Sequence, residues 1–130
     1  MQRGRPKKKE AEKLTDSILL RLNTSNYEIL KQIAEFRKLS PASLVMTELA
    51  SKKCFDKKIS DEEYEELLKR PEMMQTVSQR IVKNDVHIIR CWATKDDKKS
   101  LTHHAVVENN CSVSVFVNKT IIELIKETKI

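Results

Sequence analysis

The sequence predicts an α+β protein, in which a strand and two helices in residues 15–56 precede a smaller α+β region in residues 57–130. The strand is predicted because Ile18, Leu20 and Leu22 recur at every second position, which is typical of a strand with one buried face. The helices are predicted because the apolar residues that follow are spaced by three and four. A later return to alternating apolar residues predicts further strands in the second region.

Two start signals place the helices of the first region. Cap-type side chains at residues 23–25 predict a first helix over about residues 25–38. Its buried face would carry Tyr27, Leu30, Ile33 and Ala34. Ser40 can cap a second helix and Pro41 suits the first helical position, so a second helix is expected to about Cys54.

A single strand followed by two helices leaves an apolar face uncovered and both strand edges unpaired. A second copy would solve this problem. Two such strands, paired antiparallel in a homodimer, would carry four helices on one face and leave the other face of the ribbon free. The sequence therefore predicts a homodimer, with residues 15–56 as the dimerisation unit.

Strand, helix and helix in this order resemble the ribbon-helix-helix family of DNA-binding proteins, of the MetJ/Arc type. Three features carry the resemblance: the strand end Leu20-Arg21-Leu22, the helical core Leu30, Ile33 and Ala34, and the turn Leu39-Ser40-Pro41-Ala42-Ser43. The resemblance implies that an antiparallel ribbon enters the major groove of double-stranded DNA. It also implies that the outward strand side chains touch base edges, which here are Ser17, Leu19 and Arg21.

The same resemblance implies a phosphate contact at the start of the second helix. In this chain that position maps to Ser40, Ala42 and Ser43, through backbone amides and the positive end of the helix dipole. Lys38 stands where the family commonly has a glycine, and its ammonium group can reach a phosphate. Arg21 is the leading base-reading candidate, since a bidentate contact from arginine to guanine is the commonest specific pairing; the alternative is an ordinary exposed strand arginine.

Residues 1–14 form a basic arm before the strand. Its tip consists of Arg3, Gly4, Arg5, Pro6, Lys7 and Lys8, and Gly4 is the only glycine in the chain. This run resembles the AT-hook, a short motif that inserts arginines into the narrow minor groove of A·T-rich DNA. The alternative is a solvated basic tail that binds any polyanion. We expect the arm to be disordered and to add affinity more than specificity.

The composition favours an intracellular partner of negative charge. Lys and Arg number 25 against 19 Asp and Glu, giving a formal charge of +6. We expect no membrane-spanning helix and no signal peptide, because no apolar run is long enough and the charged start is followed by more charge. Cys54, Cys91 and Cys111 are an odd number at wide spacing, which fits reduced thiols. The expected location is cytoplasmic and nucleoid-associated.

In the second region, residues 57–130, the elements are predicted from changes in the spacing of apolar residues. A capping box at Ser60 and Glu63 predicts an acidic helix through Leu68. The further predicted elements are a short helix over 73–83, strands over 86–93, 102–108 and 112–117, turns at 95–99 and 109–110, and a last helix from Lys119. We interpret this region as a small α+β module or an extension of the dimer.

The soft-ligand residues of the second region are His87, Cys91, His103, His104 and Cys111. Their spacing matches no metal-binding motif, so we assign no metal and no cofactor. Because no glycine follows Gly4, the glycine-rich loops that bind phosphates or dinucleotides are excluded. We therefore expect no enzymatic activity.

These observations predict a homodimeric, sequence-specific DNA-binding protein whose use is transcriptional repression. Two alternatives stay open. The first is an accessory DNA-binding protein of plasmid partition or of the conjugative relaxosome. The second is an antitoxin or adaptor that binds a protein partner through residues 57–130.

Overall fold

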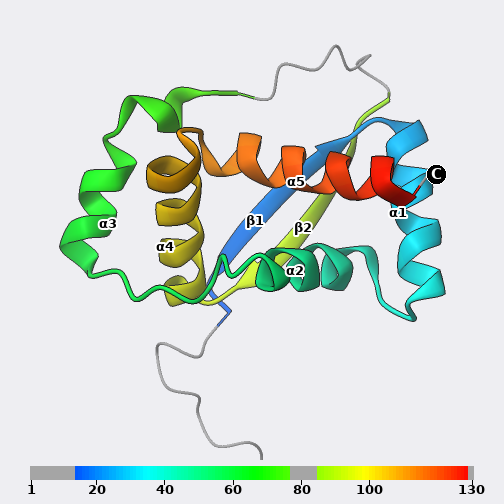
Figure 1. Ribbon diagram of the computed structural model, residues 1–130, viewed down its shortest axis with the longest axis horizontal. Helices are drawn as coiled ribbons and strands as arrows, with labels where there is room; N and C mark the ends of the chain where they lie inside the picture. Colours follow the sequence, from blue (N-terminus) through cyan, green and yellow to red (C-terminus); the bar gives the residue numbers. More distant parts are fainter. Residues whose placement is uncertain (1–13, 77–84, 129–130) are drawn as a thin grey trace, which may run out of the picture.

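A computed structural model describes residues 14–76 and 85–128 (Figure 1). The elements in order are β1 (Asp16–Leu22), α1 (Thr24–Phe36), α2 (Pro41–Ser51), α3 (Asp61–Leu68), the 3-10 turn η2 (Pro71–Met74), β2 (His87–Ala93), α4 (Lys95–His103), the π-helical stretch η3 (His104–Glu108) and α5 (Val113–Thr128). The described residues are thus mixed α+β, with five α-helices and one two-stranded antiparallel sheet, which confirms the predicted class.

The strand and two helices predicted for the first region are confirmed. The side chain of Asn23 caps α1 by accepting a hydrogen bond from the amide of Asn26 at 2.8 Å. Ser40 caps α2 in the same way, accepting from the amide of Ser43 at 3.1 Å, with Pro41 at the first helical position. Local side-chain chemistry therefore fixes both helix starts.

The partner of β1 lies in the same chain. β1 pairs antiparallel with β2 along its whole length, from Asp16 opposite Ala93 to Leu22 opposite His87. The expectation that β1 lacks a partner strand within its own chain is therefore wrong, so no second subunit is needed to complete the ribbon; the homodimer itself stays a prediction. The strand predicted over residues 86–93 is confirmed as β2, and it is this strand of the second region that pairs with β1.

Three predictions for the second region are wrong. The predicted turn at 95–99 and the predicted strand at 102–108 form the continuous helical run of α4 and η3, and the predicted strand at 112–117 is the start of α5. Thr94 caps α4 by accepting from the amide of Asp97 at 3.0 Å, and Ser112 accepts from the amide of Val115 at 3.2 Å. These caps override the strand preference of the β-branched residues that follow.

Other predictions for the second region hold in part. The cap at Ser60 and the helix after it are confirmed, because Ser60 accepts from the amide of Glu63 at 3.1 Å and opens α3 (Asp61–Leu68). The turn predicted at 109–110 between two strands instead follows the helical run of α4 and η3, where Asn110 has a left-handed backbone with φ of 56°. The short helix expected over 73–83 is replaced by η2 up to residue 74, and residues 77–84 lie outside the described part.

The chain contains two strand-helix-helix units. The first unit is β1, α1 and α2; the second is β2, the α4–η3 run and α5. Equivalent residues lie 71 positions apart in the strands and first helices, as in Leu30 and Leu101, which are both fully buried. The helix caps Ser40 and Ser112 are equivalent too, but 72 positions apart.

The π-helical stretch accounts for the change of spacing. A π turn holds one more residue than an α turn, and π-helices occur mostly as short bulges within α-helices. η3, from His104 to Glu108, lies between the equivalent residues that are 71 apart and those that are 72 apart. After it, Asn110 takes the left-handed backbone that Lys38 takes in the first unit, with φ of 56° and 59°.

The two units bury each other. α2 packs against β2 and α5 packs against β1, so the second helix of each unit covers the strand of the other. Figure 1 shows α2 and α5 flanking the ribbon, with α1 and α4 at its two ends. The main core cluster draws on residues of both predicted regions, 15–56 and 57–130. α3 and η2 connect the units, and Leu67 and Ile59 pack on Val106 in a smaller cluster.

Candidate nucleic-acid interface

The outer face of the β1–β2 ribbon is the candidate site. Side chains alternate along both strands, so the inner face is buried under the helices and the outer face is at least partly open. The outer residues are Ser17, Leu19 and Arg21 of β1 with Ile88, Arg90 and Trp92 of β2. This set carries two guanidinium groups and no carboxylate.

The antiparallel register places these six side chains in three pairs across the ribbon. Ser17 lies opposite Trp92, Leu19 opposite Arg90, and Arg21 opposite Ile88. Arg21 and Arg90 are exposed, and the apolar residues Ile88 and Trp92 are 57% and 52% exposed. The guanidinium carbon of Arg90 lies 5.6 Å from the centre of the Trp92 ring, which favours a cation–π contact. The face thus offers hydrogen-bond donors beside large apolar surfaces.

One end of the ribbon adjoins the start of α5. The ammonium group of Lys98 donates a hydrogen bond to the backbone carbonyl of Ser17 at 2.7 Å, and burial lowers the pKa of Lys98. A hollow of about 370 Å³ lies here, lined by Ser17, Leu19, Met73, Gln75, Lys98, Ser112, Val113 and Ser114. Ser17 and Leu19 are consequently half-buried, unlike Arg21.

The start of α2, predicted to contact phosphate, is open. Lys38, Ser40 and Ser43 are exposed, while Ala42 is half-buried. Besides capping the helix, the Ser40 hydroxyl donates to that of Ser43 at 3.0 Å. Lys38 has a left-handed backbone, a conformation for which glycine is usual. The first-turn amides of a helix have no intrahelical acceptor, so this end suits an anion.

The start of α5 is covered by the chain segment that follows α3. Ser112 is only 3% exposed, and its hydroxyl donates to the carbonyl of Gln75 at 3.0 Å. The Gln75 side-chain amide in turn donates to the carbonyl of Asn110 at 3.3 Å. Equivalent helix starts therefore differ: the one in the first unit faces solvent, and the one in the second faces protein.

The other end of the ribbon is tied to α1. The rings of Tyr27 and His87 stack at 4.3 Å with an interplanar angle of 4°. The Thr24 hydroxyl lies 3.1 Å from Nε2 of His87 and also hydrogen-bonds the carboxylate of Asp85. Hydrogen bonds from Thr24 hold the pKa of Asp85 below its usual value. These contacts fix where β2 begins.

The predicted soft-ligand residues do not form one cluster, although His104 and Cys111 both line a hollow of about 190 Å³. His87 stacks on Tyr27, and Cys91 is fully buried on the inner face of β2. Burial raises the pKa of Cys91 to about 11, so its thiol is protonated and unreactive at neutral pH. Among residues 14–76 and 85–128, no group of three or more His, Cys, Asp or Glu is arranged to hold a metal ion.

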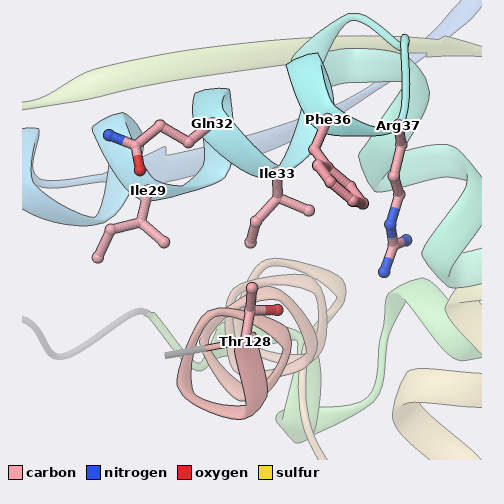
Figure 2. Close-up of a pocket in the computed structure, with 6 residues that line it drawn as sticks. All are labelled: Ile29, Gln32, Ile33, Phe36, Arg37 and Thr128. Atoms are coloured by element: carbon pink, nitrogen blue, oxygen red, sulfur yellow. The ribbon is translucent and has the colours of Figure 1, made fainter. Parts of the chain in front are cut away.

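An apolar hollow of about 560 Å³ lies away from the ribbon, between α1 and the end of α5 (Figure 2). Its lining consists of Ile29, Gln32, Ile33, Phe36, Arg37 and Thr128. Phe36 is 89% exposed, and Arg37 forms an ion pair with Glu48 at 3.2 Å. Among the described residues of this lining there is no carboxylate, imidazole or thiol.

The candidate residues predicted from sequence are only partly those of the site. Arg3, Gly4, Arg5, Pro6, Lys7 and Lys8 lie outside the described residues. Ser17, Leu19 and Arg21 do share the outer face of the ribbon, as their alternation predicted. Ile88, Arg90 and Trp92 were missed. Their signal was present, because they alternate with Ile89 and Cys91 in the same way, but their strand was not paired with β1.

Comparisons with known proteins add no assignment: no family model, no curated protein and no solved structure matches this chain. Within the part of the chain that the structure describes, no helix combines the length and apolar character needed to cross a membrane.

Proposed function

We propose that this protein binds double-stranded DNA in a sequence-specific manner by placing the outer face of the β1–β2 ribbon in the major groove. In this proposal the ribbon acts as it does in the ribbon-helix-helix family, with the difference that one chain supplies both strands. A second subunit is not needed to complete the ribbon, so a single chain is the proposed binding unit. Repression of transcription at the bound site is the proposed use.

The observation that carries this proposal is the outer face itself. The major groove of B-DNA admits a two-stranded ribbon, and arginine bound to guanine is the commonest specific contact there. Arg21 and Arg90 present exposed guanidinium groups from neighbouring strands, and none of the six outer residues is acidic. A ribbon face on which four of six outer side chains are exposed, two of them arginines, is complementary to base edges and to the surrounding phosphates.

Two further contacts support affinity in this proposal. The open start of α2 would hold a phosphate through the amide of Ala42 and the hydroxyl of Ser43, with Ser40 and Lys38 beside it; the Ser43 amide is already bonded to the Ser40 hydroxyl. The basic arm, with Arg3 and Arg5 among its cations, would reach the adjacent minor groove or phosphates.

Selection from a library of random duplexes, followed by titration of the selected DNA, tests the proposal. Arg21→Ala should weaken binding by about 1–3 kcal/mol, because a bidentate base contact is lost. Lys126→Ala is the control: it removes one positive charge too, but from an exposed position on α5, which covers the inner face. No enrichment of any sequence at low salt would contradict the proposal.

Deletion of residues 2–13 tests the arm separately. The arm carries six Lys and Arg residues, Arg3, Arg5, Lys7, Lys8, Lys9 and Lys13. Fewer counterions are released when fewer phosphates are neutralised, so the truncated protein should bind more weakly and with a flatter dependence on salt. Unchanged affinity and slope would show that the arm takes no part in binding.

A further inference from the structure

The outer face of the ribbon breaks a symmetry that its inner face keeps. Residues 71 positions apart take equivalent places in the two strands, related by an approximate twofold rotation through the middle of the ribbon. On the inner face the equivalent pairs are all apolar: Ile18 and Ile89, Leu20 and Cys91, Leu22 and Ala93. On the outer face every pair changes chemistry: Ser17 and Ile88, Leu19 and Arg90, Arg21 and Trp92.

We propose that the ribbon recognises a non-palindromic DNA site, with Arg21 and Ile88 reading one end and Ser17 and Trp92 reading the other. This inference rests on the proposed function and adds the class of sequence that is bound. Two identical strands would present the same chemistry to both halves of a site. Two strands in one chain are free of that constraint, and these two differ at each outer position.

The end with Arg21 and Ile88 combines two kinds of readout. The register places these residues directly opposite each other, and both are exposed. A guanidinium group donates two hydrogen bonds to the edge of guanine, and an aliphatic side chain packs against the methyl group of thymine. This end should therefore prefer guanine next to thymine.

The end with Ser17 and Trp92 has a different character. Trp92 is 52% exposed and brings an aromatic surface with a single indole donor, while Ser17 is half-buried. Arg90, at the middle of the ribbon, lies over the Trp92 ring and is thereby biased toward this end. Apolar contact with thymine methyl groups should dominate here, and the hydroxyl of Ser17 is tolerant in its choice of base.

The starts of α2 and α5, which lie beside the ribbon, also differ between the two units. The start of α2 is open, whereas the start of α5 is covered by the segment that contains Gln75. The two units therefore differ both in the helix starts that flank the ribbon and in the outer residues that would contact bases. A DNA site bound by this surface should therefore be bound in one orientation only.

Selection from random duplexes with the wild-type chain provides the first test. The expected consensus is non-palindromic, and reversing the order of its two halves should weaken binding on the order of tenfold or more, given the cost of mismatched contacts. A palindromic consensus would overturn this inference and leave the proposed function intact. Failure to enrich any sequence would overturn the proposed function itself.

A symmetrised variant provides the sharper test. Ile88→Ser, Arg90→Leu and Trp92→Arg together give the outer face of β2 the residues that β1 carries. All three side chains are exposed, so the core is untouched. The selected consensus should become palindromic, with the guanine read by Arg21 repeated in both halves and the thymine preference assigned to Ile88 lost. An unchanged, directional consensus would show that the ribbon does not set the polarity, and would overturn the inference.

Two single variants test each end without relying on the triple variant. Arg21→Ala should reduce discrimination on the order of ten- to hundredfold at one end of the site only. Trp92→Ala should reduce it at the opposite end only. Loss at the same positions in both variants would contradict the assignment of the ends, and circular dichroism of each variant confirms that it is folded.

Discussion

The two strand-helix-helix units are alike where they are buried and different where they are exposed. Leu30 and Leu101 are both fully buried at equivalent places, as are Val45 and Val117. Because each unit's second helix covers the other unit's strand, a change of shape in one unit must be matched in the other. No such constraint acts on the outer face. Packing therefore keeps equivalent buried residues apolar in both units, while equivalent outer residues can differ in chemistry.

The comparison predicts first that the two units fold as one. Leu30→Ala and Leu101→Ala should each lower the free energy of unfolding by about 2–5 kcal/mol, because each leaves a cavity in the shared core. Urea denaturation followed by circular dichroism and by Trp92 fluorescence measures this. The two probes should give one coincident transition in each variant.

Leu68→Ala is the matched control for these variants. Leu68 is 43% exposed on α3, so its truncation should cost far less than either core change. Separate transitions for the two probes, or a large loss for only one of the two core variants, would show that the units are independent and would break the comparison.

The second prediction concerns the two unlike helix starts. Ser40→Ala removes an exposed cap of α2 and should cost about 1 kcal/mol. Ser112→Ala removes a cap and also leaves the carbonyl of Gln75 without its buried donor, so its cost should be larger, about 1–3 kcal/mol. Thermal or urea unfolding of both variants tests the order.

Replacement of Ser112 by threonine separates the two contributions, because threonine keeps a hydroxyl that can cap and donate. Ser112→Thr should recover part of the loss. Equal losses for Ser40→Ala and Ser112→Ala would mean that the contact with Gln75 adds no stability.

The first unit was predictable from sequence because its signals are local and agree with each other. The alternation of Ile18, Leu20 and Leu22, and the caps Asn23 and Ser40, all point to the elements found. The outward direction of Arg21 followed from the same alternation. What these signals do not contain is the identity of the strand opposite.

In the second unit the strand was predicted correctly, but residues 95–117 were mispredicted because their local signals conflict. Val113, Val115 and Val117 alternate as in a strand, yet they lie in α5, where two of them are buried by tertiary packing. A comparison of the two halves at a fixed spacing would have helped, since Leu101 and Ser112 repeat Leu30 and Ser40. The π-helical stretch hides this repeat by shifting it one residue midway. Because the repeat was not detected, the outer residues of β2 were not identified as base-reading candidates.

The smallest expected effect concerns the connection between the units. The carboxylate of Asp61, at the start of α3, forms ion pairs with Lys95, at 3.6 Å, and with Lys99, whose side chain is only 8% exposed. The hydrogen bond from Lys99 comes first among the causes that hold the pKa of Asp61 below its ordinary value of 3.8. α3 lies between the two units in the chain, and its main contacts are with α4 of the second unit.

Asp61→Asn should therefore destabilise the protein slightly at neutral pH, and the loss should shrink in acid. A carboxyl whose pKa is lowered by folding stabilises the folded state above its unfolded pKa, and this contribution disappears as the pH falls through the folded pKa. Urea unfolding of wild type and variant at pH 7 and at about pH 2.5 measures the difference. Glu62→Gln, one residue away on the same helix start, is the control for the loss of a carboxylate near the helix dipole. A difference between wild type and Asp61→Asn that persists in acid would mean that the carboxylate's charge is not what holds α3 against the second unit.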